Sequence, residues 1–202
     1  MNDNPTFVAR LVHVCGFDML EEVDFDPSLY GAEPARIMAL DGNGARLMPL
    51  APAGHFSIEG RDELKRWTAH GLFPHARSPQ GALCGMYLYF SCLDEAHAIA
   101  QDLHTADGSF WHGIMHRQEP DAGNAAYWFR QVGKHPVFPA LREEAGRRQR
   151  FDTGKEWNPF VFIEFCEAAR IRPGSHEEGL AMQVQLIEWQ LLFDYCAGEK
   201  AH

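Results

Sequence analysis

The sequence predicts a mainly α-helical protein that forms a single domain, with a small β-hairpin near the N-terminus. Three observations lead to this expectation. The chain of 202 residues has the usual size of one domain. With 46% hydrophobic and 23% charged residues it can build a core, which excludes wholesale disorder. From residue 61 onwards, N-cap residues, prolines at first helical positions and apolar residues at helical spacing recur.

Residues 1–60 have the weakest apolar periodicity of the chain and many turn-forming residues, so an irregular N-terminal region is expected. Residues 7–20 fit either a short helix or a short strand. Residues 36–50 hold two apolar stretches on either side of the sequence DGNG. Because these turn residues tolerate positive φ, the pattern predicts a β-hairpin at 36–50.

Residues 61–198 are expected to form the helical body. Ser78 followed by Pro79 opens a helix whose residues 82–93 are apolar on nearly every side, so we expect this helix to be central and buried. A turn is expected at 106–109. The expected N-caps are Ser78, Asp94, Ser109, Asp121, Asn158 and Ser175. The predicted helices are residues 61–70, 78–93, 94–104, 109–119, 121–133, 139–149, 158–170 and 175–196.

The composition argues against two kinds of partner. Eighteen basic and 28 acidic residues leave a net charge of −10 with neutral histidine, which disfavours nucleic acid and anionic membranes. The apolar run at 82–93 is shorter than the roughly 20 residues that span a bilayer. The N-terminus lacks a signal-peptide pattern, and the cysteines are neither paired nor spaced as zinc ligands. A cytoplasmic protein with reduced thiols is therefore expected.

Histidine is concentrated in one part of the chain. Five of the eleven histidines fall within residues 97–135: His97, His104, His112, His116 and His135. On an ideal helix, the spacing of His112, His116 and Glu119 keeps the three side chains within about 60° of arc. Two imidazoles and a carboxylate on one stripe are the components of a divalent-metal site or of a general acid/base pair.

The preceding predicted helix has a similar stripe, formed by His97, Gln101 and His104. Short connections usually make neighbouring helices antiparallel. With the turn centred near residue 107, His104 is expected level with His112, Gln101 with His116, and His97 with Glu119. The two stripes would then converge on a polar cleft, which the third helix, 121–133, would help to line.

The leading hypothesis is a protein that binds a small anionic ligand in this cleft, as an acid/base or metal-assisted enzyme. His112 and His116 serve as base or metal ligands, and Glu119 orients a ring or coordinates the metal. Arg117 offsets the charge of the ligand, and Trp128 stacks on it. Further ligand contacts are expected from His97, Gln101, His104, Asp121, Asn124, Arg130 and His135.

Three interpretations of the histidines stay open: a structural role, a metal-free pocket and a metal site. Histidines that border an apolar face are commonly satisfied by a nearby carbonyl group. HGIMH lacks the glutamate of the HExxH metalloproteases, and Pro120 biases Glu119 out of helical geometry. The competing hypothesis for the whole chain is a helical interaction or scaffold protein whose histidines bond locally.

Residues 94–138 contain the sequence GSFWHGIMHRQEPDAGNAAYWFRQVGKHPVF, which resembles the signature of a family of uncharacterised bacterial proteins. The sequence IEWQLLFDYCAG at 187–198 resembles the C-terminus of the same family. Gln118 stands where an arginine is expected. The resemblance implies that the segment bearing the histidines is a recurrent unit, and it names no reaction.

Overall fold

The computed structural model describes residues 25–52, 57–149, 151, 152 and 154–199, so residues 7–20 lie outside the described part. The described residues form helices, with one isolated bridge between Ala76 and Glu199, which confirms the mainly α prediction. The elements are η1 (Pro27–Tyr30), α2 (Ala32–Met38), η2 (Ala39–Gly44), α3 (Ile58–Leu64), α4 (Ala69–Leu72), α5 (Pro79–Tyr89), α6 (Leu93–Asp102), α7 (Ala106–Gln118), α8 (Ala122–Val132), α9 (Val137–Gln149), α10 (Pro159–Arg170) and α11 (His176–Ala197).

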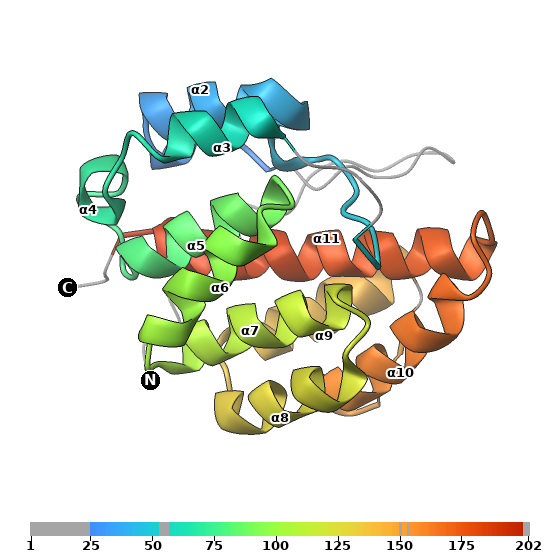
Figure 1. The fold of residues 1–202 in the computed structure, drawn as a ribbon. Helices are drawn as coiled ribbons and strands as arrows, with labels where there is room; N and C mark the ends of the chain where they lie inside the picture. Colours follow the sequence, from blue (N-terminus) through green and yellow to red (C-terminus); the bar gives the residue numbers. More distant parts are fainter. Residues whose placement is uncertain (1–24, 53–56, 150, 153, 200–202) are drawn as a thin grey trace.

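Helices α5 and α11 pack against each other in the middle of the fold (Figure 1). Every residue of α5 except Gln80 is buried, as the apolar run at 82–93 predicts. The long helix α11 also contacts α9 and α10. Trp189 of α11 donates a hydrogen bond to the Gly85 carbonyl of α5 at 2.8 Å and stacks on Phe193. Helix α11 is therefore the central helix of the core, in contact with α5, α9 and α10.

Three consecutive helices, α6, α7 and α8, pack as neighbours on one side of this core (Figure 1). Helix α7 lies between the other two and also contacts α5. Its residues 110–118 are all buried, polar ones included. Because a buried polar group without a partner is costly, the polar side chains of α7 need partners inside the protein.

Local capping explains several helix starts. Asp121 accepts a hydrogen bond from the Asn124 amide at 2.9 Å, and Ser175 accepts one from the Glu178 amide at 3.1 Å. Asn158 accepts from the amide of Phe160 at 3.0 Å, one residue after the first-turn proline. These three predicted N-caps are confirmed. They satisfy amide groups that have no partner within the first turn of a helix.

The predicted β-hairpin at 36–50 is wrong. Residues 32–38 form α2, and the turn residues Gly42 and Asn43 take positive φ within η2 rather than between two strands. The segment that follows η2 has no regular secondary structure, and side chains bond to its backbone instead of a strand. Gln185 of α11 donates to the carbonyls of Met48 and Pro49 at 3.1 and 3.2 Å. The turn residues take the positive φ that the sequence predicts, but a helix supplies the hydrogen-bond partners.

The predicted helix at 61–70 is also wrong in its bounds, because the chain breaks into α3 and α4. Thr68 interrupts the run: its backbone is extended, and its hydroxyl accepts a hydrogen bond from the Gly71 amide at 3.1 Å. A new helix therefore begins at Ala69.

The described cysteines, Cys84, Cys92, Cys166 and Cys196, are free and buried, which agrees with the predicted reduced thiols. Burial raises the pKa of both the Cys92 and the Cys166 thiol to about 12. Because the thiolate is the nucleophilic form, these two groups are unsuited to nucleophilic catalysis near neutral pH.

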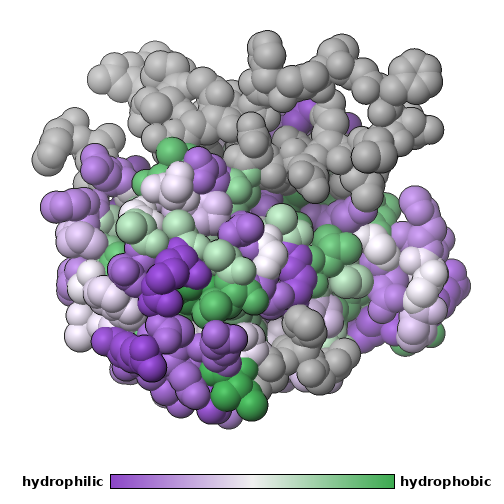
Figure 2. Space-filling view, turned by 90° about the horizontal axis from the view of Figure 1, so that it is seen from above, coloured by the Kyte–Doolittle hydropathy of each residue, from purple (hydrophilic) through white to green (hydrophobic). Residues whose placement is uncertain are grey.

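The described surface mixes hydrophilic and hydrophobic residues on the face seen in Figure 2. Large exposed apolar side chains occur on separate elements, for example Ile58 on α3, Tyr127 on α8 and Ile171 after α10. None of the described helices combines the length and the apolar character needed to cross a bilayer.

A buried ion pair joins α7 to α11. The guanidinium of Arg117 bonds to the Glu188 carboxylate, and both side chains are fully buried. The same guanidinium lies over the Phe162 ring of α10, 4.4 Å from its centre. Arg117 thus holds three helices together.

Removal of one member of this pair should be strongly destabilising. In Glu188→Leu the Arg117 charge stays buried without its counterion, so we expect a loss of about 3–5 kcal/mol in the free energy of unfolding. The double variant Arg117→Met/Glu188→Leu should recover most of this loss, because no charge is left unpaired. Urea unfolding measures both, with Arg36→Met at an exposed ion pair as the control. A double variant as unstable as Glu188→Leu alone would contradict this account.

Candidate metal centre

The candidate site lies where α6 meets α7. Helix α6 ends at Asp102 and α7 begins at Ala106, so the connection is residues 103–105. Thr105 caps α7 by accepting a hydrogen bond from the Gly108 amide at 3.2 Å. A side chain at Gly108 would collide with the Leu103 carbonyl oxygen, so glycine permits this tight connection.

This connection corrects the predicted turn. The expected turn at 106–109 is the first turn of α7, and Thr105 replaces Ser109 as the cap. The centre of the connection moves from about residue 107 to 104. Counting outward from there, His97 comes level with residue 111, beside His112. The predicted pairing of His97 with Glu119 and of His104 with His112 is therefore wrong.

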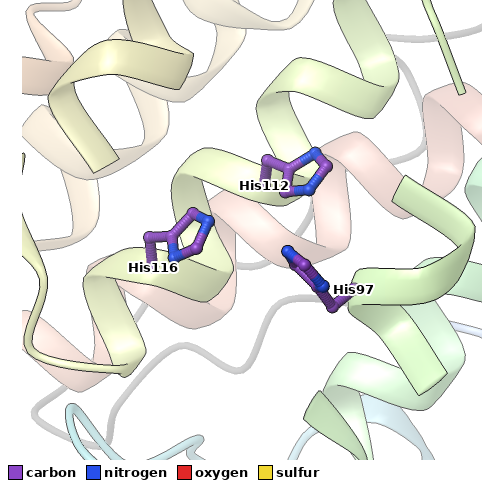
Figure 3. A group of neighbouring side chains, drawn as sticks. All are labelled: His97, His112 and His116. Atoms are coloured by element: carbon purple, nitrogen blue, oxygen red, sulfur yellow. The ribbon is translucent and has the colours of Figure 1, made fainter. Parts of the chain in front are cut away.

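Three imidazoles converge across the contact between α6 and α7. His112 and His116 lie one turn apart on α7, and His97 faces them from α6 (Figure 3). The ring centre of His97 is 5.1 Å from that of His112 and 5.8 Å from that of His116. One nitrogen from each ring lies within 4.8 Å of the other two. The three rings could hold a single metal ion.

His112 is the most enclosed of the three. It is fully buried, and neither of its ring nitrogens makes a hydrogen bond of normal geometry to a described residue. Burial, followed by the nearby His97 and His116, lowers the pKa of His112 to about 4, and the Gly108 carbonyl one turn earlier opposes this shift. The ring is therefore neutral near pH 7, with a lone pair that no protein donor uses.

His116 has a carboxylate partner. Glu119 Oε2 lies 2.9 Å from His116 Nδ1. The predicted effect of Pro120 does not separate them, because the Glu119 amide still donates to the Met115 carbonyl at 2.9 Å and continues the helix by one residue. With its Nδ1–H donated to Glu119, His116 would present the Nε2 lone pair to a metal. Carboxylates orient metal-ligating histidines in this way.

Trp128 of α8 covers one face of His112. The two rings are parallel, with an interplanar angle of 4° and centres 3.9 Å apart. Trp128 is half-buried, and its exposed neighbour Tyr127 contacts it edge-on at 5.3 Å. Trp128 thus stacks on His112 on this face, whereas the sequence predicted that it would stack on a ligand.

Arg117 does not accompany the histidines. Its guanidinium is buried against Glu188 and Phe162, and one of its nitrogens lies 3.4 Å from Gln185 Oε1. The predicted role of Arg117 as an anion clamp is wrong. One position along a helix turns a side chain by about 100°, which directs Arg117 into the core and His116 towards α6.

The structure leaves the other predicted ligand contacts outside the cluster. Gln101 is exposed on α6, and His104 is exposed in the connection rather than on the helix. Asp121 caps α8 through the Asn124 amide, and the Asn124 side chain is exposed. Arg130 is also exposed and lies over the Phe160 ring at 5.7 Å.

His135 forms a separate, locally satisfied site. The Val137 amide donates to its Nδ1 at 3.2 Å, so the ring proton is on Nε2, which lies 3.0 Å from Asp107 Oδ1. Rings of Phe110 and Tyr195 enclose it at 5.1 and 5.0 Å. Both nitrogens are used within the protein, as expected of a structural histidine.

The histidine cluster is a contact between rings rather than an open cleft. His112 and His116 are buried, whereas His97 is half-buried and Glu119 is exposed, so solvent reaches the cluster from the side of His97 and Glu119. A groove of about 820 Å³ lies elsewhere, among residues that include Tyr30, Trp67 and Arg77, and the three histidines do not line it. In place of the predicted polar cleft, the structure has only the space between three imidazoles at this position.

Compared with known proteins, the chain matches no family model, no curated protein and no solved structure. The resemblance of residues 94–138 to an uncharacterised bacterial family stays a prediction. The geometry of the histidine cluster is therefore the basis for a proposed function.

The depressed pKa of His112 predicts that the metal-free protein loses stability in acid. Between the ordinary pKa of 6.5 and the folded value of about 4, the unfolded chain binds a proton that the folded site does not. The free energy of unfolding should therefore fall as the pH falls through this interval, by up to roughly 3 kcal/mol from this group. His112→Gln removes this contribution. Chemical unfolding at pH 7, 5.5 and 4 in the presence of EDTA compares the two proteins, and parallel losses would contradict the assignment.

Proposed function

We propose that the chain binds one divalent transition-metal ion through His97, His112 and His116, as the centre of a metal-assisted enzyme. The observation that carries this proposal is the convergence of three imidazole nitrogens within 4.8 Å, one of them on a buried ring without a hydrogen-bond partner. Buried polar groups are nearly always bonded. Other buried nitrogens of the described part, such as the indole nitrogen of Trp157, also lack partners, so it is the two neighbouring imidazoles that point to a metal ion at His112. A metal ion satisfies all three lone pairs at once.

A structural role for the cluster is less consistent with its contacts. His135 illustrates a structural histidine in the same chain, with Val137 and Asp107 using its two nitrogens. His112 makes no hydrogen bond of comparable geometry to a described residue. The lone pairs of neutral imidazoles that lie close together repel one another, and protonation of one ring disfavours protonation of the next.

Metal-free acid/base catalysis is also less consistent with the cluster. A general base works best when its pKa is close to the working pH, whereas burial and two neighbouring imidazoles lower the pKa of His112 to about 4. A metal ligand needs a neutral imidazole. The same low pKa therefore suits His112 to coordination.

The donor set favours zinc or a similar ion. Imidazole nitrogen suits zinc, copper, iron and nickel, whereas magnesium and calcium prefer oxygen ligands. Tetrahedral ligands about 2.1 Å from zinc lie roughly 3.4 Å from one another. In the structure the three ring nitrogens lie within 4.8 Å of one another, so small side-chain rotations would bring them to the spacing of zinc ligands. His97 is therefore the third metal ligand, a role that the sequence suggested for Glu119. Glu119 instead bonds to the ring of His116.

Three protein ligands leave a coordination position open, as in catalytic rather than structural zinc sites. An ion in such a site lowers the pKa of a bound water towards about 7 and polarises oxygen atoms of a substrate. Its charge would attract a small anionic ligand, a role for which Arg117 is not available because Glu188 neutralises it. The half-buried His97 and the exposed Glu119 mark the side from which a ligand would approach.

Metal titration tests the proposal directly. Untagged protein stripped with EDTA should bind one equivalent of Zn²⁺ or Co²⁺ in isothermal titration calorimetry. His97→Ala, His112→Ala and His116→Ala should each weaken binding by more than about 100-fold, the upper end of the loss caused by removing an outer-shell partner. Glu119→Gln should weaken it by about 10–100-fold, because it removes the carboxylate that orients His116.

His104→Ala is the matched control for the metal titration. His104 lies in the same histidine-rich segment but is exposed in the connection before α7, so its replacement should leave the affinity unchanged. A wild-type protein that takes up no metal, or a His97→Ala variant that binds as tightly as His104→Ala, would overturn the proposed site.

A further inference from the structure

The three histidines of the proposed site differ in what orients their rings. A metal-ligating histidine usually donates its second ring N–H to a carboxylate or a carbonyl group, which holds the ring in place. His116 has such a partner in Glu119 at 2.9 Å. His112 has no carboxylate partner among the described residues, and its interaction with the Gly108 carbonyl one turn earlier falls short of normal hydrogen-bond geometry, although it is the most buried of the three. A contact of another kind therefore has to contribute to its orientation.

We propose that Trp128 is the positioning residue for His112, and that its indole strengthens metal binding by stacking on the imidazole. The inference rests on the proposed metal site. The two rings lie face to face with an interplanar angle of 4° and centres 3.9 Å apart. His97 makes a T-shaped contact with the same imidazole, with an interplanar angle of 88° and ring centres 5.1 Å apart. Between these two rings, the His112 plane has little freedom to rotate.

The packing of α8 on α7 puts the indole in this position. Phe129, the next residue of α8, is buried against Phe110 of α7 with ring centres 5.4 Å apart. Gly113 lets the two helices approach, because a Cβ atom there would lie 2.6 Å from Phe129 Cε2. Trp128 is thereby held over His112 by the core rather than by a flexible surface contact.

The stack should favour the metal-bound form over the free form. An indole face is electron-rich and attracts positive charge placed above it. Coordination withdraws electron density from an imidazole and makes its ring more positive. The same contact is therefore stronger when His112 holds a metal, and this difference adds to the affinity for the ion. An apolar side chain of similar bulk would cover His112 without this contribution.

Three variants of the EDTA-stripped protein separate this role from ordinary packing. Trp128→Leu keeps an apolar side chain but removes the aromatic face, and should weaken Zn²⁺ binding by about 10–100-fold, the loss expected for an outer-shell partner. Trp128→Phe retains a ring with a less electron-rich face and should bind with intermediate affinity. Tyr127→Leu removes the neighbouring exposed aromatic residue and should bind as the wild type does.

Two spectroscopic readouts accompany the affinities. The visible spectrum of the Co²⁺-loaded protein reports ligand geometry and should change in Trp128→Leu but not in Tyr127→Leu. In the metal-free protein, the ring-current shift of the His112 ring protons, seen by NMR, should be lost in Trp128→Leu. A role limited to packing would lower the unfolding temperature without altering the Co²⁺ spectrum.

The outcomes distinguish the two proposals. If the wild type binds Zn²⁺ and Trp128→Leu binds it equally tightly with an unchanged Co²⁺ spectrum, the positioning role is overturned and the metal site stands. If Trp128→Leu does not fold, the test is made with Trp128→Phe. A Zn²⁺ affinity of Trp128→Phe equal to that of the wild type would then overturn the positioning role of Trp128. If the wild type binds no metal, the proposed function fails and this inference fails with it.

Discussion

The enclosure of α7 by its neighbours is the constraint on which the rest of the structure depends. A helix surrounded on every side has to place its polar side chains against partners inside the protein, because water is excluded and an unpaired group is costly. Arg117 meets this demand by bonding to Glu188 of α11 and lying over Phe162 of α10. One residue earlier, His116 turns the other way and bonds to Glu119. The ion pair with Glu188 thereby fixes which face of α7 turns towards α11.

His112 differs from His116 and His135, whose rings have hydrogen-bond partners within the protein. His135 shows that the chain can build a conventional buried histidine, with both nitrogens bonded. At His112 the surroundings are aromatic and imidazole rings, and neither nitrogen makes a hydrogen bond of normal geometry to a described residue. Burial keeps this ring neutral, which is the form that coordinates a metal. In the proposed metal site, the same packing that stabilises α7 would supply the ligands, and Glu119 and Trp128 would orient two of the rings by different contacts.

The stripe of His112, His116 and Glu119 could be recognised from the sequence because it depends only on spacing within one helix. The third imidazole could not be assigned in the same way. The sequence marks His97 as a candidate ligand, but its level relative to α7 depends on where each helix ends. The cap at Thr105 and the tight turn at Gly108 shifted the connection by about three residues, which brought His97 beside His112 and left His104 in the loop. A shift of this size lies within the usual uncertainty of predicted helix ends.

What the sequence determined by itself was local: the helical class, the starts of α8, α10 and α11 at their capping residues, and the order of polar side chains along α7. Hydrogen bonds and spacings within a few residues decide these features. The tertiary structure alone decided that Arg117 faces Glu188, that Gln185 binds the segment after η2, and that Trp128 stacks on His112. The physical reason is that each additional residue rotates a helical side chain by about 100°. Contacts between helices therefore depend on exact helix ends and on long-range packing, which local spacing does not contain.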